Sequence, residues 1–372
     1  MSTSLTRPIQ YGEAMPHIGV ATSLNPESAF GTLAGRHILL CVHADANQPA
    51  AQEALAAMQK SLLLHNWDHR ALVAVSCNPA DQQHPVIQET AQKALVIWDF
   101  SYAALKAWGL VQKTAHGDQA KLGFILLDPM LRVVNSWTLS DYKAALAAFA
   151  ALPKPDDYMG VPLHAPVLVV PRVFEPAFCQ RLIKYYHDTG SEESGISRDI
   201  NGQTQNVEVP DFKRRRDSMI TDEALAAAVK ERIWTRLLPE IKRSFQFQVT
   251  QLERYLVACY DATSGGFFKP HRDDTTRGTL HRRFACTINL NAEEYEGGDL
   301  RFPEFGSRTY RAPTGGAVIF SCSLLHEATP VTRGTRYAFL PFMYDDAALK
   351  VRLANMDAVG ESVRSGVMIA AD

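Results

Sequence analysis

The stretch GGFFKPHRDD at 265–274 contains a histidine and an aspartate two positions apart, His271 and Asp273. Side chains two positions apart on a β-strand point to the same face, with Arg272 facing the other way, so both groups can reach one metal ion. Two histidines and one carboxylate on one face of the metal are the ligand set of non-haem Fe(II) oxygenases. A His-x-Asp pair alone is also typical of an ordinary polar strand surface, so a third ligand has to be found elsewhere.

Two later histidines are candidates for that ligand. His326 follows the strongly apolar segment GAVIFSCSLL, whereas His281 stands in the turn-like segment RGTLHRR. We favour His326, because a residue at the end of a buried strand can face the mouth of a barrel. Arg336 follows in GTRYAF, and a buried guanidinium pairs with a carboxylate through two parallel hydrogen bonds. The four residues together indicate a metal and an acidic co-substrate.

The elements around these residues read as short strands separated by turns, which is typical of an antiparallel sandwich or jelly roll. The predicted strands lie at 252–260, 266–274, 282–291, 299–304, 308–312, 316–323, 325–331 and 335–345. A long amphipathic helix is predicted before them at 221–245. Residues 191–220 show no period and are predicted to be a functional lid or a disordered loop. This segment includes the basic run Lys213–Arg216, interpreted as a solvated face or a substrate-facing patch.

The first part of the chain has a different pattern. Apolar strands at 37–44, 71–77 and 95–100 alternate with helical segments, and a hairpin at 121–137 and a helix at 140–152 follow. This order predicts a mixed α/β sheet covered on both faces. The segment 153–165 is rich in proline and polar residues and is predicted to link two domains, 1–152 and 166–346, with a C-terminal helix and tail at 347–372.

Composition narrows the classes of function. The 372 residues are 46% hydrophobic and 21% charged with a net charge of −2, which gives no basic excess for binding nucleic acid. No stretch is apolar enough to span a membrane, and no secretory leader is recognisable. The six cysteines form no CxxC pair and are expected to be buried thiols in a reducing cytoplasm. The sequence leaves the oligomeric state open, with a homodimer as one candidate.

The second part resembles the Fe(II)- and 2-oxoglutarate-dependent dioxygenases of the prolyl 4-hydroxylase-like group. The resemblance rests on ACYDATSGGFFKPHRDD, INLNAEEYEGGDLRFPEFG, APTGGAVIFSCSLLHEATPV and GTRYAF. It implies a double-stranded β-helix, with His271, Asp273 and His326 as iron ligands and Arg336 as the clamp for the distal carboxylate of 2-oxoglutarate. Tyr260 matches a tyrosine that hydrogen-bonds that carboxylate. Asn289 stands where many relatives carry a tyrosine facing the co-substrate.

The resemblance implies hydroxylation of a C–H bond, with O2 as second co-substrate, succinate and CO2 as products, and ascorbate as a candidate reductant. The substrate stays open between a protein side chain, prolyl or other, and a small molecule. Apolar lining from phenylalanines is expected, at Phe267, Phe268, Phe320 and Phe339. A binding or scaffold protein that retains the fold without turnover is the alternative.

Residues 8–152 resemble the thioredoxin-like fold of peroxiredoxins and redoxins, on LAGRHILLCVHAD, VAVSCNPADQQ and GFILLDPMLRVV. A peroxidatic cysteine is expected where the helix after the first strand begins, because the helix N-terminus lowers the thiol pKa. That region reads ADANQPAAQEAL and contains no cysteine. Thiol peroxidase activity is therefore disfavoured, and this domain is expected to be structural, partner-binding or dimerising.

Overall fold

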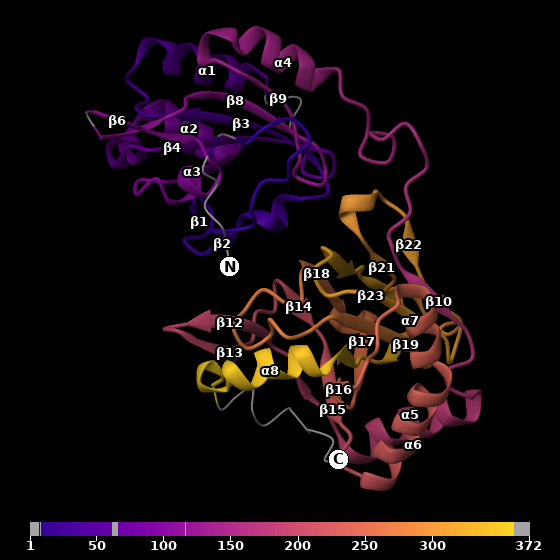
Figure 1. The fold of residues 1–372 in the computed structure, drawn as a ribbon. Helices are drawn as coiled ribbons and strands as arrows, with labels where there is room; N and C mark the ends of the chain where they lie inside the picture. Colours follow the sequence, from indigo (N-terminus) through magenta and orange to yellow (C-terminus); the bar gives the residue numbers. More distant parts are fainter. Residues whose placement is uncertain (1–6, 8, 62–65, 116, 361–372) are drawn as a thin grey trace. The chain divides into compact units, whose positions relative to one another are not determined.

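The computed structural model describes residues 7, 9–61, 66–115 and 117–360 (Figure 1). These residues form two compact units. One contains the described residues up to 163 together with 303–307, and the other contains 164–302 and 308–360. In the described part of the chain, no helix combines the length and apolar character needed to cross a membrane.

The N-terminal unit is built on a seven-stranded sheet with the order β2-β1-β5-β4-β3-β8-β9. The strands are β1 (Gly19–Thr22), β2 (Ser28–Ala29), β3 (His37–His43), β4 (Arg70–Ser76), β5 (Leu95–Trp98), β8 (Gly123–Leu127) and β9 (Val133–Trp137). β3, β4 and β5 are parallel, and the outer strands pair antiparallel. All seven residues of β3 are buried, because helices cover both faces of the sheet. The predicted mixed α/β fold is confirmed.

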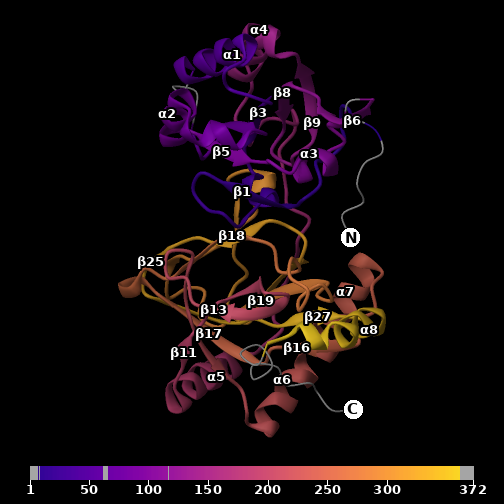
Figure 2. The same ribbon diagram turned by 90° about the vertical axis from the view of Figure 1, so that its left-hand side faces the viewer.

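The helices of this unit are α1 (Pro49–Lys60), α2 (Pro85–Lys93), α3 (Ala103–Ala107) and α4 (Tyr142–Ala150). Pro49 and Pro85 each occupy the first turn, where the missing N–H costs no hydrogen bond. α1, α2 and α4 pack on one face of the sheet, and α3 lies on the other (Figures 1 and 2). This unit also contains the short 3-10 turns η1 (Phe30–Leu33), η3 (Pro79–Gln83) and η4 (Leu139–Asp141). A polar hairpin is formed by β6 (Val111–Thr114) and β7 (Gly117–Ala120), and the sequence analysis did not predict it.

The C-terminal unit contains two antiparallel sheets. The larger has the order β10-β23-β19-β26-β17-β15-β11, with β16 and β27 attached. Its strands are β10 (Leu168–Val170), β11 (Glu192–Glu193), β15 (Arg216–Met219), β16 (Gln251–Glu253), β17 (Leu256–Asp261), β19 (Phe284–Asn289), β23 (Ala317–Ser321), β26 (Thr335–Phe339) and β27 (Phe342–Tyr344). The smaller has the order β14-β18-β24-β21-β22, formed by β14 (Lys213–Arg214), β18 (Phe267–His271), β21 (Leu300–Arg301), β22 (Thr309–Tyr310) and β24 (His326–Ala328).

From β17 to β26 the chain passes repeatedly from the larger sheet to the smaller and back. This alternation is the double-stranded β-helix that the family resemblance implies, and that expectation is confirmed. Two further two-stranded pairs flank the sheets: the hairpin of β12 (Ile196–Ile200) with β13 (Gln203–Val207), and the long-range pair of β20 (Glu296–Gly297) with β25 (Val331–Arg333). This unit also contains η5 (Ala262–Ser264), α8 (Asp346–Ala354) and η7 (Met356–Ala358), whereas η6 (Pro303–Phe305) belongs to the N-terminal unit. Residues 361–372 of the predicted C-terminal tail lie outside the described part.

Three helices, α5 (Pro176–Thr189), α6 (Glu223–Arg236) and α7 (Leu238–Phe245), cover the outer face of the larger sheet (Figure 1). The prediction of one helix over 221–245 is wrong. The chain breaks at Leu237, because Pro239 lacks the N–H that a continuous helix needs. Asp222 begins α6 by accepting a hydrogen bond from the Leu225 N–H at 2.7 Å.

The prediction of a disordered loop at 191–220 is wrong, and the alternative of a functional lid stays a prediction. These residues form β11 to β15, and β15 pairs with β17 within the larger sheet. Polar side chains hide the strand period here, because several of them pair with one another instead of facing water. Arg215, for example, pairs with Asp217, and both side chains are largely buried. Much of the segment is therefore paired β-structure, with β11 and β15 in the larger sheet and β14 in the smaller.

Candidate metal centre and its pocket

His271 and His326 lie directly opposite each other on the antiparallel strands β18 and β24. Asp273 lies two residues beyond His271, in a bend after the strand, where its N–H donates to the Cys322 carbonyl at 2.9 Å. This bend brings the carboxylate back to the histidine rings. One ligand atom from each of the three residues lies within 4.8 Å of the other two. The three predicted ligands therefore converge.

Hydrogen bonds to the backbone orient both imidazoles. His271 Nδ1 lies 2.8 Å from the Lys269 carbonyl, and His326 Nδ1 lies 3.0 Å from the Leu324 carbonyl. A carbonyl only accepts, so each Nδ1 carries the proton and each Nε2 presents a lone pair. The Nε2 atoms lie 3.5 Å (His271) and 3.3 Å (His326) from the two carboxylate oxygens of Asp273. This arrangement fits a first-row divalent metal bound by two nitrogens and a carboxylate.

The charge states also suit metal binding. Burial, followed by the electrostatic influence of His326, lowers the pKa of His271 to about 4. Burial raises the pKa of Asp273, but His326 and His271 outweigh that effect and hold the pKa well below its usual value. Near neutral pH the site thus offers a neutral His271 and an ionised carboxylate, which are the protonation states that a metal requires.

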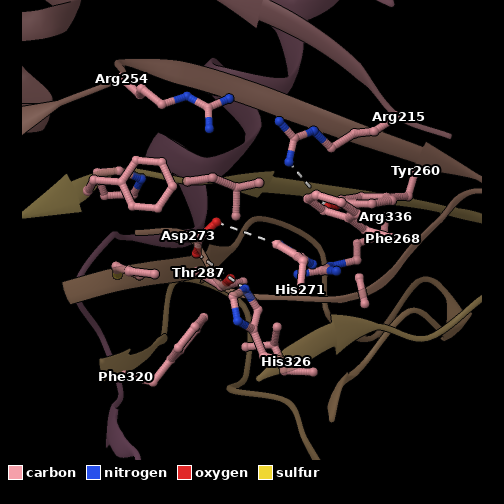
Figure 3. Close-up of a pocket in the computed structure, with 17 residues that line it drawn as sticks. Arg215, Arg254, Tyr260, Phe268, His271, Asp273, Thr287, Phe320, His326 and Arg336 are labelled. Atoms are coloured by element: carbon pink, nitrogen blue, oxygen red, sulfur yellow. Dashed lines mark hydrogen bonds and ion pairs between the residues drawn. The ribbon is translucent and has the colours of Figure 1, made fainter. Parts of the chain in front are cut away.

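The three residues open into a pocket between the two sheets of this unit (Figure 3). Its lining is formed by Arg215, Arg254, Tyr260, Phe268, His271, Asp273, Ala285, Cys286, Thr287, Leu300, Phe320, His326, Ala328, Arg336, Leu340, Pro341 and Phe342. Two of the expected phenylalanines, Phe268 and Phe320, are among them. Phe339 belongs to the core under the helices, and Phe267 is not part of the lining.

Arg336 extends from β26 and is almost completely buried. Its Nε and Nη1 atoms form no hydrogen bond with the described residues. A buried cation with unpaired donors is costly unless a ligand supplies acceptors. Its guanidinium carbon lies 4.9 Å from the centre of the Tyr260 ring, on the paired strand β17. Arg336 therefore fits a carboxylate-bearing molecule bound beside the metal.

The other predicted site residues differ in their placement. Tyr260 lines the pocket, and its hydroxyl lies 3.4 Å from the Nη1 donor of Arg215. Asn289 does not line it; its Nδ2 donates to the Ala312 carbonyl at 2.7 Å. His281, the alternative third ligand, lies in a buried network with Glu253 at 2.8 Å. It is not among the metal-binding cluster of the described residues.

The sequence analysis missed Arg215 and Arg254 as pocket residues. The run Lys213–Arg216 alternates in the structure, with Lys213 and Arg215 buried and the other two exposed. This alternation follows from the extended backbone, in which successive side chains point to opposite faces. Treating the run as a strand rather than a loop could have identified Arg215. The interpretation as one solvated face is wrong.

The cysteines of the N-terminal unit lack the features of a peroxidatic thiol. Cys41 is enclosed within β3 and Cys77 follows β4, and burial raises the pKa of each thiol to about 12. At neutral pH both remain protonated, and the thiolate is the reactive form. The geometry gives no support to a thiol peroxidase.

We expect the native protein to resist alkylation by iodoacetamide at about pH 8, because all six thiols are buried. Denatured protein should instead gain six labels by mass spectrometry. Ser140→Cys, at an exposed position of η4, provides the control and should label rapidly in the folded state. Rapid labelling of any wild-type thiol contradicts the expectation.

Comparisons with known proteins agree with this site. Residues 255–344 match the model of the 2OG-Fe(II) oxygenase superfamily, so this part of the chain is a 2OG-Fe(II) oxygenase domain. A PKHD-type hydroxylase from Synechococcus sp. is 32% identical over 112 residues, which are 27% of this chain and 49% of the relative. A PKHD-type hydroxylase from Cupriavidus metallidurans is 32% identical over 124 residues, 30% of this chain and 54% of the relative. The chain thus spans about half the length of the curated relatives it matches.

Solved structures resemble each unit separately. A Trichoplax adhaerens prolyl hydroxylase, in complex with a hypoxia-inducible factor peptide fragment, shares 17% identity with a TM-score of 0.41, covering 50% of this chain and 86% of that one. Xylella fastidiosa PrxQ shares 13% identity with a TM-score of 0.34, covering 38% of this chain and 96% of that one.

Proposed function

We propose that this chain is an Fe(II)- and 2-oxoglutarate-dependent dioxygenase that hydroxylates a C–H bond and releases succinate and CO2. One observation carries the proposal. His271, Asp273 and His326 direct their ligand atoms into the same pocket that holds the unpaired guanidinium donors of Arg336. The pocket therefore offers ligand atoms for a metal and hydrogen-bond donors for a dicarboxylate.

In this proposal His271, Asp273 and His326 hold the iron. Bound iron supplies the redox chemistry that couples decarboxylation of 2-oxoglutarate to oxidation of the substrate. Arg336 pairs with the distal carboxylate of 2-oxoglutarate and fixes its orientation, and the buried Tyr260 ring packs beside that pair. Phe268, Phe320 and Leu300 limit the access of water to the reacting atoms.

We assign the oxygenase role to a domain of residues 166–346 and propose that residues 1–152 form a thioredoxin-like domain with a structural, partner-binding or dimerising role. The substrate class is a protein side chain, prolyl or other, or a small molecule. A cytoplasmic location and stimulation by ascorbate belong to the same proposal. PKHD-type hydroxylases match about half of their length to this chain, which supports the reaction class alone.

The test combines product formation with substrate discovery. Purified protein loaded with Fe(II) and 2-oxoglutarate should form succinate only in the presence of O2, and incubation with a cell lysate should create products heavier by about 16 Da, one oxygen atom. Mass spectrometry of proteins and metabolites, with and without O2, detects both. Binding of iron and 2-oxoglutarate without any succinate or oxidised product contradicts the proposal and favours a scaffold role.

A further inference from the structure

Two arginines line the metal pocket to which the proposed function assigns no part in holding the metal or 2-oxoglutarate. Arg215 lies between β14 and β15, and Arg254 lies between β16 and β17. Both fall outside residues 255–344, the stretch that matches the oxygenase family. In Figure 3 their guanidinium groups approach each other on one side of Tyr260 and Asp273.

Asp217 is the shared carboxylate partner of both arginines, and it binds Arg215 more closely than Arg254. Asp217 accepts two short hydrogen bonds from Arg215, from Nε at 2.7 Å and from Nη2 at 2.6 Å. This is the two-pronged pairing that neutralises a guanidinium most completely. Arg254 Nη2 reaches the same carboxylate only at 3.4 Å. Asp217 is therefore committed to Arg215, and Arg254 is left with a partial counter-charge.

The neighbouring charged groups do not supply the missing anion. Glu253 is bound by His281 at 2.8 Å, by Arg282 at 2.7 Å and by Arg352 at 3.4 Å. Asp273 is surrounded by the two metal-binding histidines. Burial lowers the pKa of Lys213 well below its usual value, and its amine donates to the Gly195 carbonyl at 2.6 Å. The pair of arginines with Asp217 thus carries one excess positive charge.

Arg254 has an energetically unfavourable backbone conformation. Its φ angle is +67°, in the left-handed region that non-glycine residues rarely adopt. Such conformations persist where the surroundings enforce them, and they concentrate at functional sites. The Arg254 guanidinium lies 5.4 Å from the centre of the Phe342 ring, another residue of the pocket lining. Burial, together with the charge of Arg215, lowers the pKa of Arg254 to about 10, so it is still a cation at neutral pH.

We propose that Arg254, supported by Arg215, binds a carboxylate of the primary substrate, at a position separate from the 2-oxoglutarate seat at Arg336. This inference rests on the proposed function. One excess positive charge matches a single carboxylate, and a guanidinium fork suits its planar geometry. The oxidised C–H bond then lies within reach of the metal on a molecule anchored through its acid group. The carboxylate belongs either to a free acid or chain terminus, or to an acidic side chain.

The experiment uses the full chain loaded with Mn(II) and saturating 2-oxoglutarate in the absence of O2, so that Arg336 is occupied and no turnover follows. Two acids are titrated calorimetrically against their neutral amides. N-Acetylglycine against N-acetylglycinamide represents a terminal carboxylate, and the α-amide of N-acetylaspartic acid against N-acetylasparaginamide represents an acidic side chain. In one of these two acid–amide pairs, the acid should bind at least about tenfold more tightly than the amide. The pair that responds identifies the source of the carboxylate.

Arg254→Gln should reduce this preference to within about twofold and leave 2-oxoglutarate affinity unchanged. Arg254→Lys keeps the charge without the fork and should retain an intermediate preference. Arg216→Gln is the matched control, because Arg216 is exposed and pairs with Glu193 outside the pocket. This variant should keep the wild-type ratio.

Each contrary result has a distinct meaning. Equal binding of acid and amide by the 2-oxoglutarate-loaded wild type overturns the inference alone, and so does a preference that survives in Arg254→Gln. If Arg254→Gln loses 2-oxoglutarate binding, Arg254 belongs to the 2-oxoglutarate site, and the inference is also overturned. Failure of the wild type to bind Mn(II) or 2-oxoglutarate overturns the proposed function, and the inference with it.

Discussion

The variant Asp273→Ala is expected to lose Fe(II) binding and O2-dependent succinate formation together. Asp273 is the sole carboxylate of the described metal cluster, and both imidazole Nε2 atoms lie within 3.5 Å of its oxygens. Loss of an outer partner of a metal ligand already costs about 10- to 100-fold in metal affinity, so loss of the ligand itself should exceed that range. Metal content after dialysis and succinate assays measure the two effects.

The neighbouring carboxylate provides the control for that variant. Asp274 accepts a hydrogen bond from Ser323 and is not part of the metal cluster. Asp274→Asn should therefore retain iron and turnover. An Asp273→Ala protein that binds iron like the wild type would show that the cluster is an ordinary buried ion-pair network.

Replacing Arg336 with leucine is expected to have opposite effects on co-substrate binding and on stability. Truncating one partner of a buried charge pair costs about 2–5 kcal/mol, so the Kd for 2-oxoglutarate should rise roughly 30-fold to several thousandfold. Without 2-oxoglutarate, however, the unpaired Nε and Nη1 donors of Arg336 destabilise the folded wild-type protein. Arg336→Leu should therefore raise the Tm of the ligand-free protein while abolishing the increase in Tm caused by 2-oxoglutarate.

Arg333→Ala is the matched control, because Arg333 is exposed and pairs with Glu296 at 2.6 Å. Its loss should change neither the co-substrate affinity nor the stability by more than about 0.5 kcal/mol. Normal 2-oxoglutarate affinity in Arg336→Leu argues against the clamp, and a lower Tm of its ligand-free form shows that the guanidinium is satisfied by the protein itself.

The three residues of the candidate metal cluster were predictable because each carries a local signal. His271 and Asp273 stand two positions apart after an aromatic pair, and His326 ends one of the most apolar runs of the chain. Alternation along strands and the order of the blocks then suffice to bring them together. The same signals predicted Arg336, since GTRYAF lies on a strand of obvious period.

The residues that were missed are those whose neighbours obscure the period. Arg254 sits at a positive φ between β16 and β17, so the predicted continuous strand at 252–260 gave no indication that its side chain turns inward. In Lys213–Arg216, four consecutive basic residues conceal an alternation of buried and exposed positions. Polar strands held by ion pairs cannot be distinguished from loops by hydrophobicity alone. The break at Pro239 was visible in the sequence and was overlooked.

The direct pairing of His271 with His326 across β18 and β24 has a consequence for folding. A metal ion bound to both histidines is a cross-link between two adjacent strands, and it closes the long stretch of chain between them. The free energy of metal binding would offset part of the entropy lost on closing that loop, so metal affinity and the stability of the smaller sheet would be linked. If the proposed iron site is correct, removal of iron is expected to loosen the pairing of β18 with β24 as well as to abolish activity.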